Sequence, residues 1–187
     1  MLGIAAAALA IMLPLFLHSR DVPESPPRVV PSVDLSRFAG RWYEVARLPN
    51  PFQEDCAGEV SVDYTRRENG DLQVVNRCRT KSGEMEEVQG VARPADPQGP
   101  KSKLKVRFAP SFLSFLPFVW GDYWILDLAP DYSYAVVGGP QRKHLWILSR
   151  TPAMDADVYE KIVDRLAKEG YQVSRLIQTD HTLGVER

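Results

Sequence analysis

The sequence contains little cysteine and histidine, and it has almost no excess of either charge. Its 187 residues include 2 Cys and 3 His, and 23 Lys and Arg stand against 24 Asp and Glu, a formal net charge of −1. Two cysteines are too few for a disulfide-built scaffold or a four-thiolate zinc site. The balanced charge argues against a nucleic-acid binder, which normally carries a basic excess. Because His18, His144 and His181 show no metal-ligand spacing and no catalytic motif, we expect no metal, no cofactor and no catalytic residues.

The sequence also lacks an apolar run long enough to span a bilayer comfortably. Residues 2–17 read LGIAAAALAIMLPLFL, which is shorter than the roughly 20 residues that a transmembrane helix needs. The run has the size of the apolar part of an export signal. No Lys or Arg precedes it, however, and Leu17-x-Ser19 is a poor cleavage pattern. We therefore interpret residues 1–20 as an export signal or an uncleaved membrane tether, with no nearby Cys for lipidation.

A proline-rich stretch follows. Residues 22–33 read VPESPPRVVPSV, a composition typical of an extended, semi-rigid spacer. The sequence thus predicts a spacer over residues 21–33, a folded domain over 34–180 and a short tail over 181–187.

Alternation of apolar and polar residues predicts strands in the folded domain. Val60, Val62 and Tyr64 alternate with polar neighbours, and Asn69-Gly70 then supplies a strong hairpin signal. Similar segments, some apolar on both faces, predict eight strands, near residues 42–48, 60–65, 72–77, 86–92, 103–108, 123–128, 134–137 and 145–148. Eight short antiparallel strands with hairpin links are typical of a sandwich or a closed barrel.

One helix is expected near the C-terminus. Val158, Ile162 and Leu166 recur every four residues, and Gly170 suits the left-handed position that ends a helix. The apolar pair at 176–177 predicts a last short strand.

Three motifs stand at fixed places among these elements. Gly40-x-Trp42 opens the first strand, Asp131-Tyr132 precedes the seventh, and Arg150 follows the eighth. This set, in this order, resembles the lipocalins, and most of all the bacterial outer-membrane lipocalins and their apolipoprotein D relatives. The resemblance implies an all-β fold, an eight-stranded antiparallel up-and-down β-barrel with one C-terminal α-helix.

Barrel topology predicts that these motifs meet. In an up-and-down barrel every second connection lies at the same end, so Trp42, Asp131-Tyr132 and Arg150 converge at one end. We expect the Arg150 guanidinium to lie over the Trp42 indole, a cation–π contact worth about 0.5–2 kcal/mol. Such a cluster would hold the barrel shut rather than bind a ligand.

An eight-stranded barrel is just wide enough to hold one small ligand. The resemblance implies storage or transport of a fatty acid or lysophospholipid at the bacterial cell envelope, in the periplasm or at the outer membrane. The alternative is that the inward side chains simply fill the barrel. Trp124 and Trp146 are the least determined, because their strands are apolar on both faces. The candidate ligand-binding residues are Val60, Val62, Tyr64, Val74, Asn76, Leu104, Val106, Phe108, Trp124 and Trp146.

The loop at the opposite end is unusually apolar. Residues 110–119 read PSFLSFLPFV and contain Phe112, Phe115 and Phe118. A large apolar patch in a loop usually marks a binding or membrane surface. We expect ligand entry, membrane contact or self-association as a homodimer here, the last being the basis of an alternative role as a structural envelope protein. A second alternative is that these side chains plug the barrel.

The two cysteines flank the predicted hairpin. A two-residue turn would not place Cys56 and Cys78 directly opposite each other, but a bulge or a longer turn would bring them together. In an exported chain two cysteines more often form a bridge than remain free, and this one would stabilise the fold by about 3 kcal/mol. The enzyme alternative is a barrel that uses Cys78 as a nucleophile.

Overall fold

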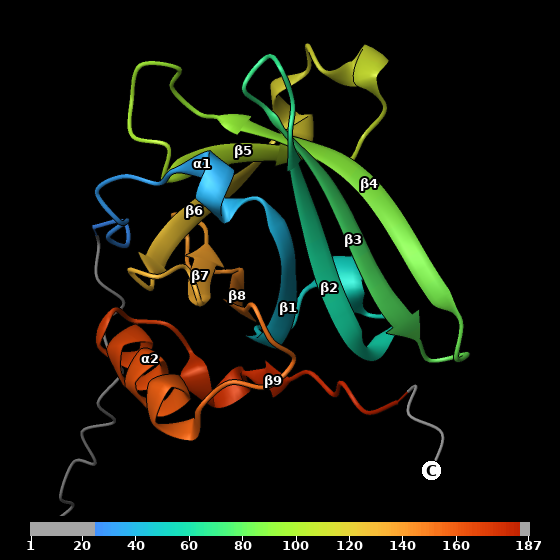
Figure 1. The fold of residues 1–187 in the computed structure, drawn as a ribbon, viewed down its shortest axis with the longest axis vertical. Helices are drawn as coiled ribbons and strands as arrows, with labels where there is room; N and C mark the ends of the chain where they lie inside the picture. The colour runs from blue at the N-terminus through green and yellow to red at the C-terminus, as the bar shows by residue number, and fades with distance from the viewer. Residues whose placement is uncertain (1–24, 184–187) are drawn as a thin grey trace, which may run out of the picture.

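The eight predicted strands form and close into one barrel (Figure 1). The computed structural model describes residues 25–183. Neighbouring strands pair in chain order from β2 to β8, and β1 pairs with both β8 and β2. This confirms the antiparallel up-and-down barrel. Its strands are β1 (Gly40–Arg47), β2 (Cys56–Arg66), β3 (Leu72–Thr80), β4 (Met85–Pro94), β5 (Lys103–Arg107), β6 (Gly121–Leu128), β7 (Tyr134–Gly138) and β8 (Leu145–Ser149).

Within the described residues, two helices and one short strand flank the barrel. In α1 (Leu35–Phe38) the side chain of the preceding Asp34 accepts a hydrogen bond from the backbone of the second residue at 2.8 Å, the usual role of an N-cap. Helix α2 (Ala156–Lys168) lies against the outer wall (Figure 1), and β9 (Ile177–Gln178) pairs with β1. The described part of the chain also contains four 3₁₀ turns, η1 (Pro51–Gln53), η2 (Ser111–Leu113), η3 (Pro117–Val119) and η4 (Val173–Arg175).

Apolar side chains form two separate cores. One lies inside the barrel and includes Phe38 and Trp42. The other lies between the barrel wall and α2, where Ile162 and Leu166 pack against wall residues such as Val136. The strands that α2 covers are therefore apolar on both faces, which is why their sequences show dense apolar runs rather than alternation.

The described part of the proline-rich segment lies against the barrel rather than apart from it. The backbone N–H of Val30 donates to the carbonyl of Ile125 at 3.1 Å, and Val33 is buried. Packing against the barrel thus begins before Asp34, where the folded domain was expected to start. At the other end His181, placed in the predicted tail, hydrogen-bonds the Glu44 carbonyl through Nε2 at 2.7 Å.

The predicted export segment, residues 1–20, lies outside the described residues. Within residues 25–183, no helix has the length and apolar character needed to cross a membrane.

Candidate functional site

The three sequence motifs meet at one end of the barrel, as predicted. The Arg150 guanidinium carbon lies 3.8 Å from the centroid of the Trp42 ring. Arg150 also donates through Nη1 to the carbonyl of Arg41 at 2.9 Å and through Nη2 to that of Arg37 at 2.7 Å. The Trp42 indole N–H donates to the carbonyl of Phe38 at 2.8 Å. These bonds tie the segment of α1 across this end and close it.

The structure also explains the motif residues Gly40 and Tyr132. Gly40 has φ of +94°, and a Cβ there would lie 3.2 Å from Nη1 of Arg150, so glycine relieves both strain and crowding. In the turn that Asp131 begins, the hydroxyl of Tyr132 accepts a hydrogen bond from the backbone N–H of Asp34 at 3.0 Å. The motif residues therefore hold the closed end together and take no part in lining the cavity.

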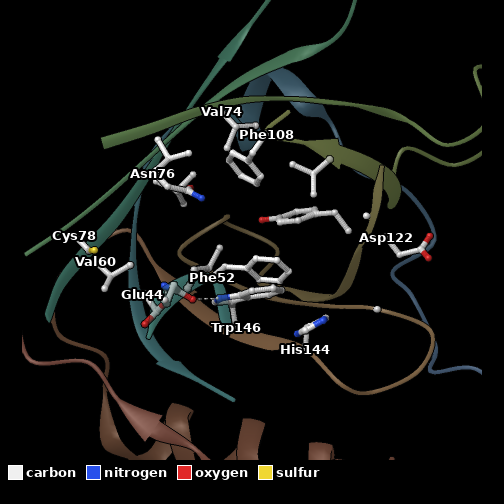
Figure 2. A pocket seen from close by; sticks show the side chains of 18 of the residues that line it. Glu44, Phe52, Val60, Val74, Asn76, Cys78, Phe108, Asp122, His144 and Trp146 are labelled. Atoms are coloured by element: carbon white, nitrogen blue, oxygen red, sulfur yellow. Dashed lines mark hydrogen bonds between the residues drawn. The ribbon is translucent and has the colours of Figure 1, made fainter. Parts of the chain in front are cut away.

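A cavity of about 710 Å³ lies inside the barrel between side chains that project from its walls (Figure 2). Its lining extends to Phe52, Phe118 and Pro140, in the loops at the open end, opposite the Arg150–Trp42 contact. Its volume lies within the range of small-molecule sites, about 300–1,000 Å³. In Figure 2 Val74 and Asn76 project into it from β3, facing Trp146 on another wall. The predicted residues that line it are Val60, Val62, Tyr64, Val74, Asn76, Val106, Phe108 and Trp146.

Two predicted ligand-binding residues do not line the cavity. Leu104 points inward but is fully buried in the inner core. Trp124 belongs to the outer cluster beneath α2, and the Nζ of Lys103 lies 4.3 Å from its ring centroid. Its neighbour Tyr123 faces the cavity instead. Strand β6 is apolar on both faces because α2 covers its outer side, so the sequence pattern could not tell which face is the inner one.

A buried polar cluster on the cavity wall was missed from the sequence. Glu44 is 2% exposed, and Arg47 donates through Nη1 to its carboxylate at 2.9 Å. The amide of Gln53 donates to the same carboxylate at 2.7 Å, and its oxygen accepts from the indole N–H of Trp146 at 2.8 Å. Thr179 donates to Glu44 at 2.6 Å. The cluster thus links η1, β8 and the C-terminal segment around one carboxylate.

The cysteines form the predicted disulfide, with Cα atoms 5.6 Å apart. Cys56 is paired with Thr80 in register, and irregularities on either side of Gly58 shift the strand toward Cys78. Both cysteines line the cavity. The bridge consumes both thiols, which removes the nucleophile that the enzyme alternative requires.

Phenylalanines surround the open end. Phe112, Phe115 and Phe118 are 73–80% exposed, and Phe52 of η1, which was not predicted from the sequence, is 74% exposed. We call these four the mouth phenylalanines. Phe52 and Phe118 line the cavity. The alternative that the 110–119 loop plugs the barrel is wrong for these side chains, which lie in solvent.

His144 lies at the same opening. Its ring stacks at 5.9 Å on Trp146, and its Nδ1 is buried without a hydrogen-bond partner among residues 25–183. Burial, with a smaller effect of Lys143, lowers the pKa of the imidazole below its usual value. Over the same residues, no group of three or more His, Cys, Asp or Glu side chains is placed to hold a metal ion.

Comparison with known proteins agrees with this geometry. The chain is 40% identical over 152 residues to temperature-induced lipocalin-1 of Arabidopsis thaliana, covering 81% of each chain. It is 34% identical over 181 residues to the outer membrane lipoprotein Blc of Escherichia coli K12, covering 95% of each. Insecticyanin of the tobacco hornworm Manduca sexta has the same fold, with a TM-score of 0.61, 24% identity and coverage of 84% of this chain and 85% of that one.

The family model for the lipocalin-like domain matches residues 33–181. This range includes the Arg150–Trp42 closure, all eight barrel strands and α2. With the closed end, the open cavity and the curated relatives in agreement, the chain belongs to the lipocalin family.

Proposed function

We propose that this lipocalin binds one fatty acid or lysophospholipid and stores or transports it at the bacterial cell envelope. Lipocalins are known for binding small hydrophobic ligands and are generally binding proteins rather than enzymes. The observation that carries the proposal is the cavity of about 710 Å³, closed by Arg150 and Trp42 at one end and open at the other.

The apolar lining is sufficient for useful affinity. Burying a dozen methylene groups contributes roughly 10 kcal/mol at about 0.8 kcal/mol each. Association costs remove about 4 kcal/mol or more. The remainder of about 6 kcal/mol corresponds to a Kd of the order of tens of micromolar, which suits a carrier that must also release its ligand.

The envelope location is supported by two observations. The relative from Escherichia coli is named an outer membrane lipoprotein, and the apolar run at residues 2–17 has the size of an export signal. We assign this chain to the periplasm or the outer membrane, reached by export.

The mouth phenylalanines favour exchange of ligand with a membrane. Phe118 and Phe52 line the cavity and are also exposed, so a lipid leaving a bilayer would meet aromatic surface continuous with the cavity. Exposed apolar patches of this kind mark membrane or protein contacts, and the first matches a lipid cargo.

A fluorescent fatty acid tests the proposal. We expect saturable uptake at one site per chain and displacement by unlabelled palmitate or lysophosphatidylcholine. Val74→Trp, inside the cavity, should abolish uptake, whereas Val75→Trp on the neighbouring outward position is the matched control. Equal uptake by both variants, or none by the wild type, would refute a ligand-binding cavity. Native mass spectrometry of gently extracted protein would identify the bound lipid.

A further inference from the structure

Two tyrosines meet across the interior of the barrel. Tyr64 comes from β2 and Tyr123 from β6, and their hydroxyls share a hydrogen bond. Four strand steps separate β2 from β6 in the eight-stranded ring, so the two side chains reach inward from opposite walls. Both line the cavity. The pair therefore forms a bar across the barrel.

This bar is the floor of the cavity. The ring of Tyr64 packs on Phe38 at 5.2 Å between centroids, and Phe38 packs on Trp42 at 5.0 Å. Trp42 in turn lies under Arg150 at the closed end. The stack from Arg150 to Tyr64 thus fills the barrel below the hydroxyls, and the space above them is open to a ligand.

The pair has one hydroxyl proton to spare. Each phenol carries one proton and can accept hydrogen bonds, and the shared bond uses only one of the two protons. Among the described residues, neither hydroxyl makes another hydrogen bond. Burial raises the pKa of both Tyr64 and Tyr123 far above the physiological range, so both remain protonated. A donor left unused in a buried site costs free energy, and a ligand acceptor would satisfy it.

The acceptor at the floor is a neutral group. Three side chains that can carry a positive charge line the cavity among the described residues, Arg77, Lys143 and His144, and burial lowers the pKa of the His144 imidazole. Arg77 is already paired with Asp63 and with Glu87, the latter at 2.8 Å, and Lys143 is exposed. A carboxylate at the floor would therefore lack a counter-ion, which is costly in a buried site. The acidic head group of a bound lipid would therefore stay at the open end of the barrel.

We propose that the Tyr64–Tyr123 pair is a specificity site for a long-chain lipid that carries a neutral oxygen, a hydroxyl or a carbonyl, at the far end of its chain. This inference rests on the proposed function, because it places the lipid with its head at the mouth and its chain in the barrel. The spare phenol proton is donated to the terminal oxygen of the lipid.

Paired ligands that differ only at the chain end test the inference. Palmitate and ω-hydroxypalmitate are titrated into the wild type and into the double variant Tyr64→Phe/Tyr123→Phe. The set is repeated for chains from lauric to stearic length, because the hydroxyl must reach the floor. At the best length the wild type should prefer the hydroxylated acid. In the double variant the ratio of the two Kd values should shift about tenfold toward the plain acid, since a buried ligand hydroxyl then lacks its partner.

The single variants Tyr64→Phe and Tyr123→Phe are the controls. Each keeps one phenol and one donor proton, so each should retain the preference of the wild type. If the tyrosines only support the fold, both ligands weaken equally and the ratio stays constant at every length, which overturns the inference. In that case tight binding of palmitate would leave the proposed function standing. Failure of the wild type to bind any of these acids would overturn both.

Discussion

The guanidinium of Arg150 covers the indole of Trp42 at 3.8 Å and at the same time donates hydrogen bonds to backbone carbonyls at the end of α1 and the start of β1. One side chain thus joins the end of β8 to the beginning of the barrel. Because β1 pairs with both β2 and β8, this contact lies where the sheet closes on itself.

Removing this contact should destabilise the fold. Arg150→Ala loses the cation–π contact and at least two charge-assisted hydrogen bonds, and we expect a loss of about 2–4 kcal/mol in the free energy of unfolding. Urea titration followed by tryptophan fluorescence measures it. Arg175→Ala, at an exposed arginine whose side chain bonds only to nearby Gln172 among residues 25–183, should change stability by less than about 0.5 kcal/mol. Similar losses in the two variants would contradict the assigned role.

The disulfide should contribute through the unfolded chain. The bridge between Cys56 and Cys78 closes a loop of 22 residues, for which chain entropy predicts about 3 kcal/mol. Reduction with a phosphine should therefore lower the urea midpoint of the wild type. The double variant Cys56→Ser/Cys78→Ser should have the lower urea midpoint both with and without the reductant. An unchanged midpoint on reduction would show that the bridge is energetically neutral.

Glu44 should be essential for the stability of the fold, because its carboxylate is buried and paired with Arg47 at 2.9 Å. Glu44→Gln leaves the Arg47 cation buried without its counter-ion, and we expect a loss of about 3–5 kcal/mol. The exposed carboxylate of Glu87 provides the control, since Glu87→Gln should cost less than about 1 kcal/mol. The apolar double variant Glu44→Leu/Arg47→Met should recover much of the loss. Calorimetric or urea unfolding of all four proteins checks this, and equal losses for the two single variants would count against it.

Much of the architecture could be predicted from the sequence because many strands have one face exposed to solvent. Where the outer face meets water, as in β2 and β5, alternation identifies inward residues such as Val62 and Val106, and both line the cavity. Where α2 covers the outer face, this signal is lost. For that reason the prediction that Trp124 lines the cavity was wrong, whereas Trp146 of β8 does face inward.

The polar parts of the site were harder to predict. Glu44 follows Trp42 by two residues and so shares its inward face, but a carboxylate inside an apolar barrel is unexpected without its partners. Those partners, Gln53 and Thr179, come from η1 and from beyond β9. Likewise the contact of Tyr64 with Tyr123 depends on barrel closure, and local pattern carries no information about it.

His144 should make the fold sensitive to mild acid. Its pKa is lowered by burial, so the unfolded chain binds a proton more readily than the folded chain once the pH falls below about 6.5. Stability should therefore fall as the pH drops from about 6.5 through the lower pKa of the folded state. His144→Gln should flatten this part of the curve, as measured by urea midpoints at several pH values.

Two carboxylates that accept hydrogen bonds nearer the surface act in a lower pH window than His144. Hydrogen bonds lower the pKa of Asp63, chiefly that from Arg41, and of Asp131, chiefly that from Ser133. Their stabilisation is present above the unfolded pKa of about 3.9 and is lost as the pH falls through the lower folded values. Asp131→Asn should therefore leave the slope near pH 6 intact. A His144→Gln variant with the full wild-type slope near pH 6 would show that another group causes it.

The mouth phenylalanines should control membrane contact. Each fully buried phenylalanine contributes about 1.5–3 kcal/mol, so Phe115→Ser/Phe118→Ser should weaken binding to phosphatidylcholine–phosphatidylglycerol vesicles by about tenfold or more in a flotation assay. Both side chains are exposed, so stability should change little. Ile177→Ser removes a partly exposed apolar group on β9, outside the cavity lining, and should bind vesicles like the wild type. Analytical sedimentation tests the alternative of self-association. If the double substitution converts a dimer into monomers and leaves vesicle binding unchanged, the patch is a protein interface.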